Sequence, residues 1–140
     1  MPPSIVSLGE VLWDLFPEGA RFGGAPANFA CHAAVLGCDV AMVSAVGDDP
    51  RGREAVGILR GYGIDTTLVQ RLEDAPTGTV GVSLDADGKP TFVIHEGSAW
   101  DRSACEVAAA VCAQPGAVPD CPGVDEGGSP TGAADPTSRD

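Results

Sequence analysis

The most informative part of the sequence is Gly23-Gly24-Ala25-Pro26-Ala27-Asn28-Phe29-Ala30, followed by single glycines at positions 37 and 47. Two consecutive glycines let the backbone approach a ligand closely, and Pro26 suits the first turn of a helix. Small residues then recur as far as Leu36, which is typical of a helix that packs on a sheet, and Gly37 provides its C-terminal stop. Taken alone, the pattern also fits a plain turn before a helix that Asn28 caps.

On both sides of this stretch, extended runs alternate with helical ones. We expect strands over 4–8, 11–16, 39–46, 66–70, 79–85 and 91–96, and helices over 26–36 and 51–60. Pro17, Glu18 and Gly19 are predicted to end the second strand in a turn. Asp49 is predicted to cap the second helix, and the turn over 86–89 joins the last two strands as a hairpin. This alternation predicts an α/β fold with a parallel sheet and an added antiparallel flap.

The charge of the chain excludes several classes of partner. Its 140 residues include 8 Lys and Arg against 20 Asp and Glu, which gives a net charge of −12 and a pI near 4.2. Such acidity disfavours nucleic acids and anionic membranes, and no apolar run approaches the ~18 residues of a membrane span. The N-terminus also lacks the basic region of a secretory signal. We therefore expect a soluble, cytoplasmic protein.

The composition changes abruptly near residue 100. Every Leu, Ile, Phe, Tyr and Trp lies within residues 1–100, and residues 101–140 contain none. Without large apolar side chains, the second segment cannot offset the roughly 1–2 kcal/mol per residue that backbone ordering costs. We expect a folded unit over 1–100 and a disordered tail over 101–140, apart from a short Ala-rich helix across 105–112.

The cysteines form no recognisable framework. No CxxC pair occurs, so we expect reduced thiols rather than a zinc site or disulfides. The five residues are Cys31, Cys38, Cys105, Cys112 and Cys121.

Asp14 is the only charged residue in the apolar run 11–16, and strand alternation places it on the same face as Leu12 and Phe16. A carboxylate there lies either at a solvated edge or against a ligand, because burial of an unpaired charge is costly. One carboxylate can accept two hydroxyl hydrogen bonds, each worth about 1.5–3 kcal/mol. The vicinal hydroxyls of a sugar would satisfy it.

The spacing from Gly24 through Asn28 and Gly37 to Gly47 resembles the N-terminal signature of the PfkB (ribokinase-like) carbohydrate kinase family. The chain is most similar to the fructokinase branch, and the resemblance extends from residue 4 to about residue 101. Further matching segments are Gly9-Glu10, Phe22-Gly23-Gly24, Ser44-Ala45-Val46-Gly47-Asp48-Asp49, Gly63-Ile64-Asp65, Pro76-Thr77-Gly78 and Ser98-Ala99-Trp100-Asp101.

The resemblance implies which residues bind the substrate. Asp14 and Asn28 would bind sugar hydroxyls, and Gly23 and Gly24 would let the backbone approach the sugar. The extended segments 11–16 and 79–96 would form a small β-lid that closes over the sugar and mediates a homodimer. The expected fold is therefore the N-terminal part of a ribokinase-like parallel sheet with flanking helices, plus this lid.

The resemblance also implies ATP as the phosphoryl donor, with Mg²⁺, and a Gly-Ala-Gly-Asp motif that supplies the catalytic base. No Gly-x-Gly-Asp sequence occurs in this chain, and residues 101–140 do not resemble the family. We therefore expect a truncated, fructokinase-like chain that keeps sugar-binding elements but has no catalytic residue, ATP site or metal site, and is inactive alone.

Two alternatives remain open. The first is a non-catalytic remnant that binds sugar weakly or associates through its lid strands. The second is a nucleoside kinase, in which Trp13, Phe16 and Trp100 would stack on a base. His32 and His95 have no visible partner for acid–base work in the sequence, and we assign neither a role.

Overall fold

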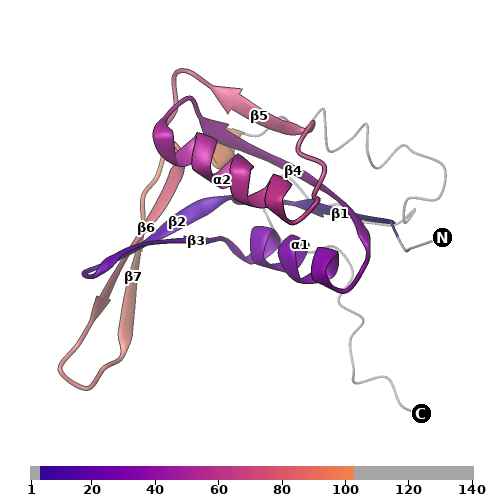
Figure 1. Cartoon of the computed structure of the whole chain (residues 1–140). Helices are drawn as coiled ribbons and strands as arrows, with labels where there is room; N and C mark the ends of the chain where they lie inside the picture. The colour runs from indigo at the N-terminus through magenta and orange to yellow at the C-terminus, as the bar shows by residue number, and fades with distance from the viewer. Residues whose placement is uncertain (1–3, 103–140) are drawn as a thin grey trace, which may run out of the picture. The chain divides into compact units, whose positions relative to one another are not determined.

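The computed structural model describes residues 4–102 (Figure 1). They belong to a unit that spans Met1–Ala108. The helix expected across 105–112 lies outside the described residues, as does all of the predicted disordered tail except Asp101 and Arg102. These two residues end a short 3₁₀ helix, η1 (Ala99–Arg102).

A three-stranded parallel sheet forms the centre of the described unit. Its strands are β1 (Ser4–Leu8), β4 (Asp39–Gly47) and β5 (Val69–Leu72), in the order β1-β4-β5. The parallel sheet expected from the sequence is thus confirmed. β5 begins three residues later than predicted, because Thr67 and Leu68 form a turn that the Val69 N–H closes by donating to the Thr66 carbonyl at 3.0 Å.

Two helices pack on this sheet, as predicted (Figure 1). Helix α1 (Ala25–Val35) contacts β1 and β4, and helix α2 (Pro50–Gly61) contacts β4. Small residues at Ala27, Ala30 and Ala33 line the buried side of α1, which lets the helix lie close to the sheet. The helices and the sheet share one hydrophobic core with Trp13.

A second, four-stranded sheet contains the two extended segments expected to form a lid, and we call it the lid. Its strands are β2 (Leu12–Phe16), β3 (Gly19–Gly23), β6 (Gly78–Leu84) and β7 (Pro90–Ile94), in the order β3-β2-β6-β7. The β6–β7 hairpin is antiparallel as expected, but β2 and β6 run parallel, so the sheet is mixed.

Strand β3 was not predicted from the sequence. Only a turn was expected after Pro17, whereas the chain reverses there and returns antiparallel to β2 over Gly19–Gly23. The segment has glycine at both ends and is mostly exposed, so it carries little apolar alternation. Its pairing with β2 makes it a strand.

No helix among residues 4–102 is long and apolar enough to cross a membrane. Within the same residues, no group of three or more His, Cys, Asp or Glu is arranged to hold a metal ion.

Candidate functional site

Asp14 and Gly23 are in direct contact across the β2–β3 hairpin. Asp14 lies in the middle of β2, half-buried, and Gly23 ends β3. A Cβ atom built on Gly23 would lie 2.5 Å from Asp14 Oδ2. The carboxylate therefore occupies the space left by the missing side chain, and the structure brings these two predicted site residues together.

The carboxylate of Asp14 has no hydrogen-bond or ion-pair partner within residues 4–102. Arg21, its neighbour across the hairpin, is engaged elsewhere: it pairs with Glu18 at 3.5 Å, and its guanidinium lies 4.7 Å from the centre of the Phe16 ring. Burial raises the pKa of Asp14 above its ordinary value. These acceptor oxygens can receive hydrogen bonds from a hydroxylated ligand.

Apolar side chains surround this carboxylate on the same face of the lid. Leu12, Val80 and Val82 form a buried cluster with Phe16 packed against it, and Val80 is the direct register partner of Asp14. Sequence reasoning missed the two valines, because only the parallel β2–β6 pairing places them beside Asp14. A carboxylate beside an apolar surface suits a ligand with both hydroxyl groups and C–H faces.

Gly24 holds the start of α1 against the β1–β2 connection. Its φ of 101° favours glycine, and a Cβ atom there would lie 2.6 Å from the Glu10 carbonyl oxygen. The Ala25 N–H donates to Glu10 Oε1 at 3.3 Å, and Ser7 Oγ donates to the Pro26 carbonyl at 2.8 Å. These contacts hold the glycine pair beside the strand that carries Asp14.

Asn28 lies in the first turn of α1, as predicted, and its N–H donates to the Gly24 carbonyl at 2.9 Å. Its side chain is exposed and lines a cavity of about 410 Å³ that does not include Asp14. Within the described residues, no hydrogen bond joins Asn28 to Asp14. The other residues that line this cavity are Phe22, Cys31, His32, Val35, Ile58 and Tyr62.

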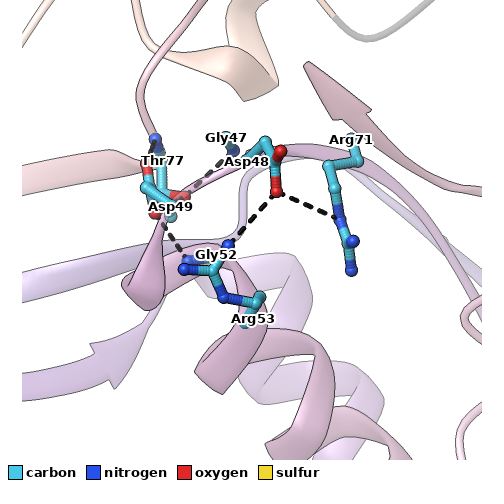
Figure 2. A network of polar contacts seen from close by, with 7 residues as sticks. All are labelled: Gly47, Asp48, Asp49, Gly52, Arg53, Arg71 and Thr77. Carbon is cyan, nitrogen blue, oxygen red and sulfur yellow. Dashed lines mark hydrogen bonds and ion pairs between the residues drawn. The ribbon is translucent and has the colours of Figure 1, made fainter. Parts of the chain in front are cut away.

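A second polar cluster lies where α2 begins (Figure 2). Asp49 caps the helix as predicted, with Oδ1 accepting the Gly52 N–H at 2.8 Å. The same carboxylate also accepts two hydrogen bonds from Thr77: from its hydroxyl at 2.7 Å and from its backbone N–H at 2.9 Å. The Gly47 N–H donates to the Thr77 hydroxyl at 2.9 Å. Thr77 was missed as a partner because it lies 28 positions away in the sequence.

The two adjacent aspartates of this cluster differ in environment. Desolvation raises the pKa of Asp49, but the hydrogen bonds from Thr77 and Gly52, together with the charge of Arg51, outweigh it and lower the pKa below its ordinary value. Asp48 instead faces solvent, where it pairs with Arg53 at 3.2 Å and with Arg71 at 4.0 Å. Asp49 is therefore tied to the interior of the fold, whereas Asp48 belongs to its surface.

The aromatic residues considered for base stacking are occupied by the fold. Trp13 is 5% exposed, meets Phe22 edge-on with ring centroids 5.9 Å apart, and donates its indole N–H to the Arg51 carbonyl at 3.1 Å. Phe16 is covered by Arg21, and the indole of Trp100 packs against Gly78.

The histidines and cysteines differ in their surroundings. His95 has a partner that the sequence did not reveal, since its Nδ1 lies 2.6 Å from the Thr79 hydroxyl. His32 lines the same cavity as Asn28. Among the described residues, Cys31 and Cys38 have free thiols. The remaining three cysteines lie outside the described residues.

Comparison with known proteins identifies the same family over most of the chain. A family model described as pfkB family carbohydrate kinase matches residues 18–119. The chain is 38% identical over 109 residues to fructokinase-1 of Oryza sativa subsp. japonica, covering 69% of this chain and 34% of that protein. It is 40% identical over 90 residues to the fructokinase of Klebsiella pneumoniae, covering 61% and 29%.

Solved structures agree with this result. The apo fructokinase from Vibrio cholerae O395 matches with a TM-score of 0.63 at 30% identity, covering 69% of this chain and 36% of that one. An uncharacterized sugar kinase from Pyrococcus horikoshii in complex with ATP matches with a TM-score of 0.63 at 28% identity, covering 74% and 39%. The chain spans about a third of the length of the curated relatives it matches.

Proposed function

The chain belongs to the pfkB family of carbohydrate kinases, and from that premise we propose that it is the sugar-binding, N-terminal portion of a fructokinase-like enzyme. Such an enzyme transfers a phosphoryl group from ATP to a sugar hydroxyl. The observation that carries the proposal is the half-buried Asp14 carboxylate, which lies over Gly23 and has no partner within residues 4–102. The names of the fructokinase relatives support fructose as the sugar.

In this proposal, two hydroxyl groups of the sugar donate hydrogen bonds to Asp14. The apolar cluster of Leu12, Val80 and Val82 offers a surface for the C–H groups of the ring. Gly23 leaves room for the Asp14 carboxylate, and Gly24 lets the start of α1 lie against the Glu10 carbonyl. Asn28 lines a separate cavity, so we assign it no contact with the sugar at Asp14. The aromatic side chains provide no free stacking surface at Trp13 or Phe16, which favours a sugar over a nucleoside.

ATP would supply the phosphoryl group and Mg²⁺ would neutralise its charge. Among residues 4–102, no group of three or more His, Cys, Asp or Glu is arranged to hold a metal ion, so we name no residue that would hold the metal or the nucleotide. The sequence also contains no Gly-x-Gly-Asp motif. We assign no phosphoryl-transfer step to these residues, and the chain alone is proposed to be inactive.

A second candidate function is association through the lid, without catalysis. The residues of β7 are all exposed, and Phe92, Val93 and Ile94 are 60%, 55% and 63% exposed. An apolar strand at a sheet edge is a surface on which a second copy can pair. Sedimentation of wild type and Val93→Lys tests this function: a concentration-dependent dimer that the substitution abolishes supports it, and a monomeric wild type contradicts it.

Calorimetric titration with fructose tests the main proposal. Because the site is formed from one side only, we expect weak binding, near or above 1 mM, which corresponds to about −4 kcal/mol. Asp14→Ala should abolish it, whereas Asp87→Ala, which removes an exposed carboxylate from the β6–β7 turn, should not. Equal binding by wild type and Asp14→Ala, or heat only with adenosine, would contradict the proposal.

Catalysis is tested separately by a coupled assay for ADP release from the purified chain with ATP, Mg²⁺ and fructose. We expect no sugar-dependent turnover. Turnover that depends on fructose would show that the chain contains a phosphoryl-transfer site that these residues do not reveal.

A further inference from the structure

Both inner strands of the lid are tied to the same turn of helix α2. Thr77, the residue before β6, donates two hydrogen bonds to the Asp49 carboxylate. Trp13, in β2, donates its indole N–H to the Arg51 carbonyl at 3.1 Å. The residues 49–51 therefore hold β2 and β6 at one place on the central core.

We propose that the Asp49–Thr77 pair is a positioning element of the sugar site: it fixes the start of β6, and β6 in turn fixes Asp14. This inference rests on the proposed function, because it takes Asp14 as the sugar-binding carboxylate.

Thr77 is held from two sides. Its side chain and backbone are only 4% exposed. The hydroxyl donates to Asp49 at the start of α2 and accepts from the Gly47 N–H at the end of β4 (Figure 2). Hydrogen bonds to an ionised carboxylate are about twice as strong as neutral ones. Thr77 is thus fastened to both the helix and the central sheet.

The pairing of β6 with β2 connects Thr77 to Asp14. Gly78 follows Thr77 and pairs with Leu12, and two positions later Val80 pairs with Asp14. Gly78 is also confined, since a Cβ atom there would lie 2.5 Å from Cδ1 of Trp100. A displacement of Thr77 would therefore be transmitted along β6 to the register partner of Asp14.

Thr77→Val tests this role because it removes the hydroxyl and keeps the backbone N–H. We expect fructose affinity to fall by about tenfold, as the loss of a hydrogen bond to a charged group predicts. Thr77→Ser, which keeps the hydroxyl, should bind fructose with the affinity of the wild type. Thr91→Val makes the same chemical change at an exposed position of β7 and should bind like wild type.

The two tryptophans of the chain provide a readout that a general loss of stability would not reproduce. With 5-fluorotryptophan and ¹⁹F NMR, Thr77→Val should shift the Trp100 signal, because its indole packs on Gly78, and Thr77→Ser should return it. Wild-type affinity in Thr77→Val, or a loss that Thr77→Ser does not restore, overturns the inference. If Thr77→Val does not fold, Asp49→Asn, which keeps the side-chain volume, takes its place in the same measurements.

Hydrogen exchange separates this inference from the proposed function. If wild type binds no fructose, the proposed function fails, but the positioning role still predicts faster amide exchange in both β2 and β6 of Thr77→Val. Unchanged exchange in both strands, or acceleration that Thr77→Ser does not reverse, would overturn the positioning role.

Discussion

The carboxylate of Asp14 lies where a side chain of Gly23 would be, with 2.5 Å between Oδ2 and the position of a Cβ atom. The atom that this Cβ would approach lies at the flexible end of the Asp14 side chain and not in the backbone. Gly23 also lacks the positive φ that would exclude other residues. A methyl group at this position would therefore displace the carboxylate and leave the hairpin in place.

Gly23→Ala should consequently separate binding from stability. We expect the free energy of unfolding to change by less than about 1 kcal/mol, while calorimetry shows a loss of fructose binding. Gly81→Ala is the matched control, since its Cβ would meet Val93 at an ordinary 3.8 Å in the same sheet. Undiminished binding by Gly23→Ala would mean that Asp14 does not bind the ligand from this position.

Asp14→Asn should stabilise the fold and abolish binding. Burial raises the pKa of Asp14 in the folded protein, so the ionised form is disfavoured there relative to the unfolded chain. Its contribution to stability is complete below the unfolded pKa and is lost as the pH rises through the folded pKa. Denaturant unfolding at pH 7 should therefore show Asp14→Asn to be more stable than wild type.

The same experiment at low pH provides the check. Below the ordinary value of 3.8, Asp14 is protonated in both states and its ionisation no longer contributes, so the advantage of Asp14→Asn should shrink. A variant that is less stable than wild type at pH 7 would show that the carboxylate has a stabilising partner.

Local signals in the sequence were sufficient to predict most of the fold. Pro26 and Gly37 mark the ends of α1, and Asp49 caps α2 as its position before Pro50 predicts. Strand β3 could not be predicted in this way, because its glycines and exposed residues carry no periodic signal and only pairing with β2 defines it.

The candidate site, like the fold, could be predicted from the sequence only in part. Asp14 and Gly23 could each be selected from the sequence, but their contact depends on the unpredicted β2–β3 hairpin. The link between Asp49 and Thr77 depends on tertiary structure, since nothing local at either residue specifies a partner 28 positions away.

Asp49→Asn should destabilise the protein in a pH-dependent way. The pKa of Asp49 is lowered in the folded state, so its contribution to stability is present above the unfolded pKa and is lost as the pH falls through the folded pKa. At pH 7 we expect the free energy of unfolding to drop by about 2 kcal/mol, as the loss of a helix cap and of charged hydrogen bonds predicts. The difference from wild type should narrow as the pH falls below 3.8.

The neighbouring residue provides the control for this prediction. Asp48 carries the same charge, but its side chain is 42% exposed in its pairs with Arg53 and Arg71. Asp48→Asn should therefore cost less than about 1 kcal/mol, because surface ion pairs contribute little. If the two variants lose equal stability at pH 7, the contacts of Asp49 with Thr77 contribute no more than a surface pair.

Gly52 and Gly57, both within α2, should respond to alanine in opposite directions. A Cβ atom on Gly52 would collide with the Gly47 carbonyl oxygen and lie 2.8 Å from Oγ1 of Thr77, whereas one on Gly57 would meet nothing within 4 Å. Gly57→Ala should stabilise the protein by about 0.5–1 kcal/mol through helix propensity. Gly52→Ala should destabilise it by about 2 kcal/mol or more, because backbone atoms must move to relieve the collision. Thermal unfolding of the two variants checks this directly. If Gly52→Ala were as stable as Gly57→Ala, the first turn of α2 could not lie against the end of β4, and neither lid strand would be tied to the core through that turn.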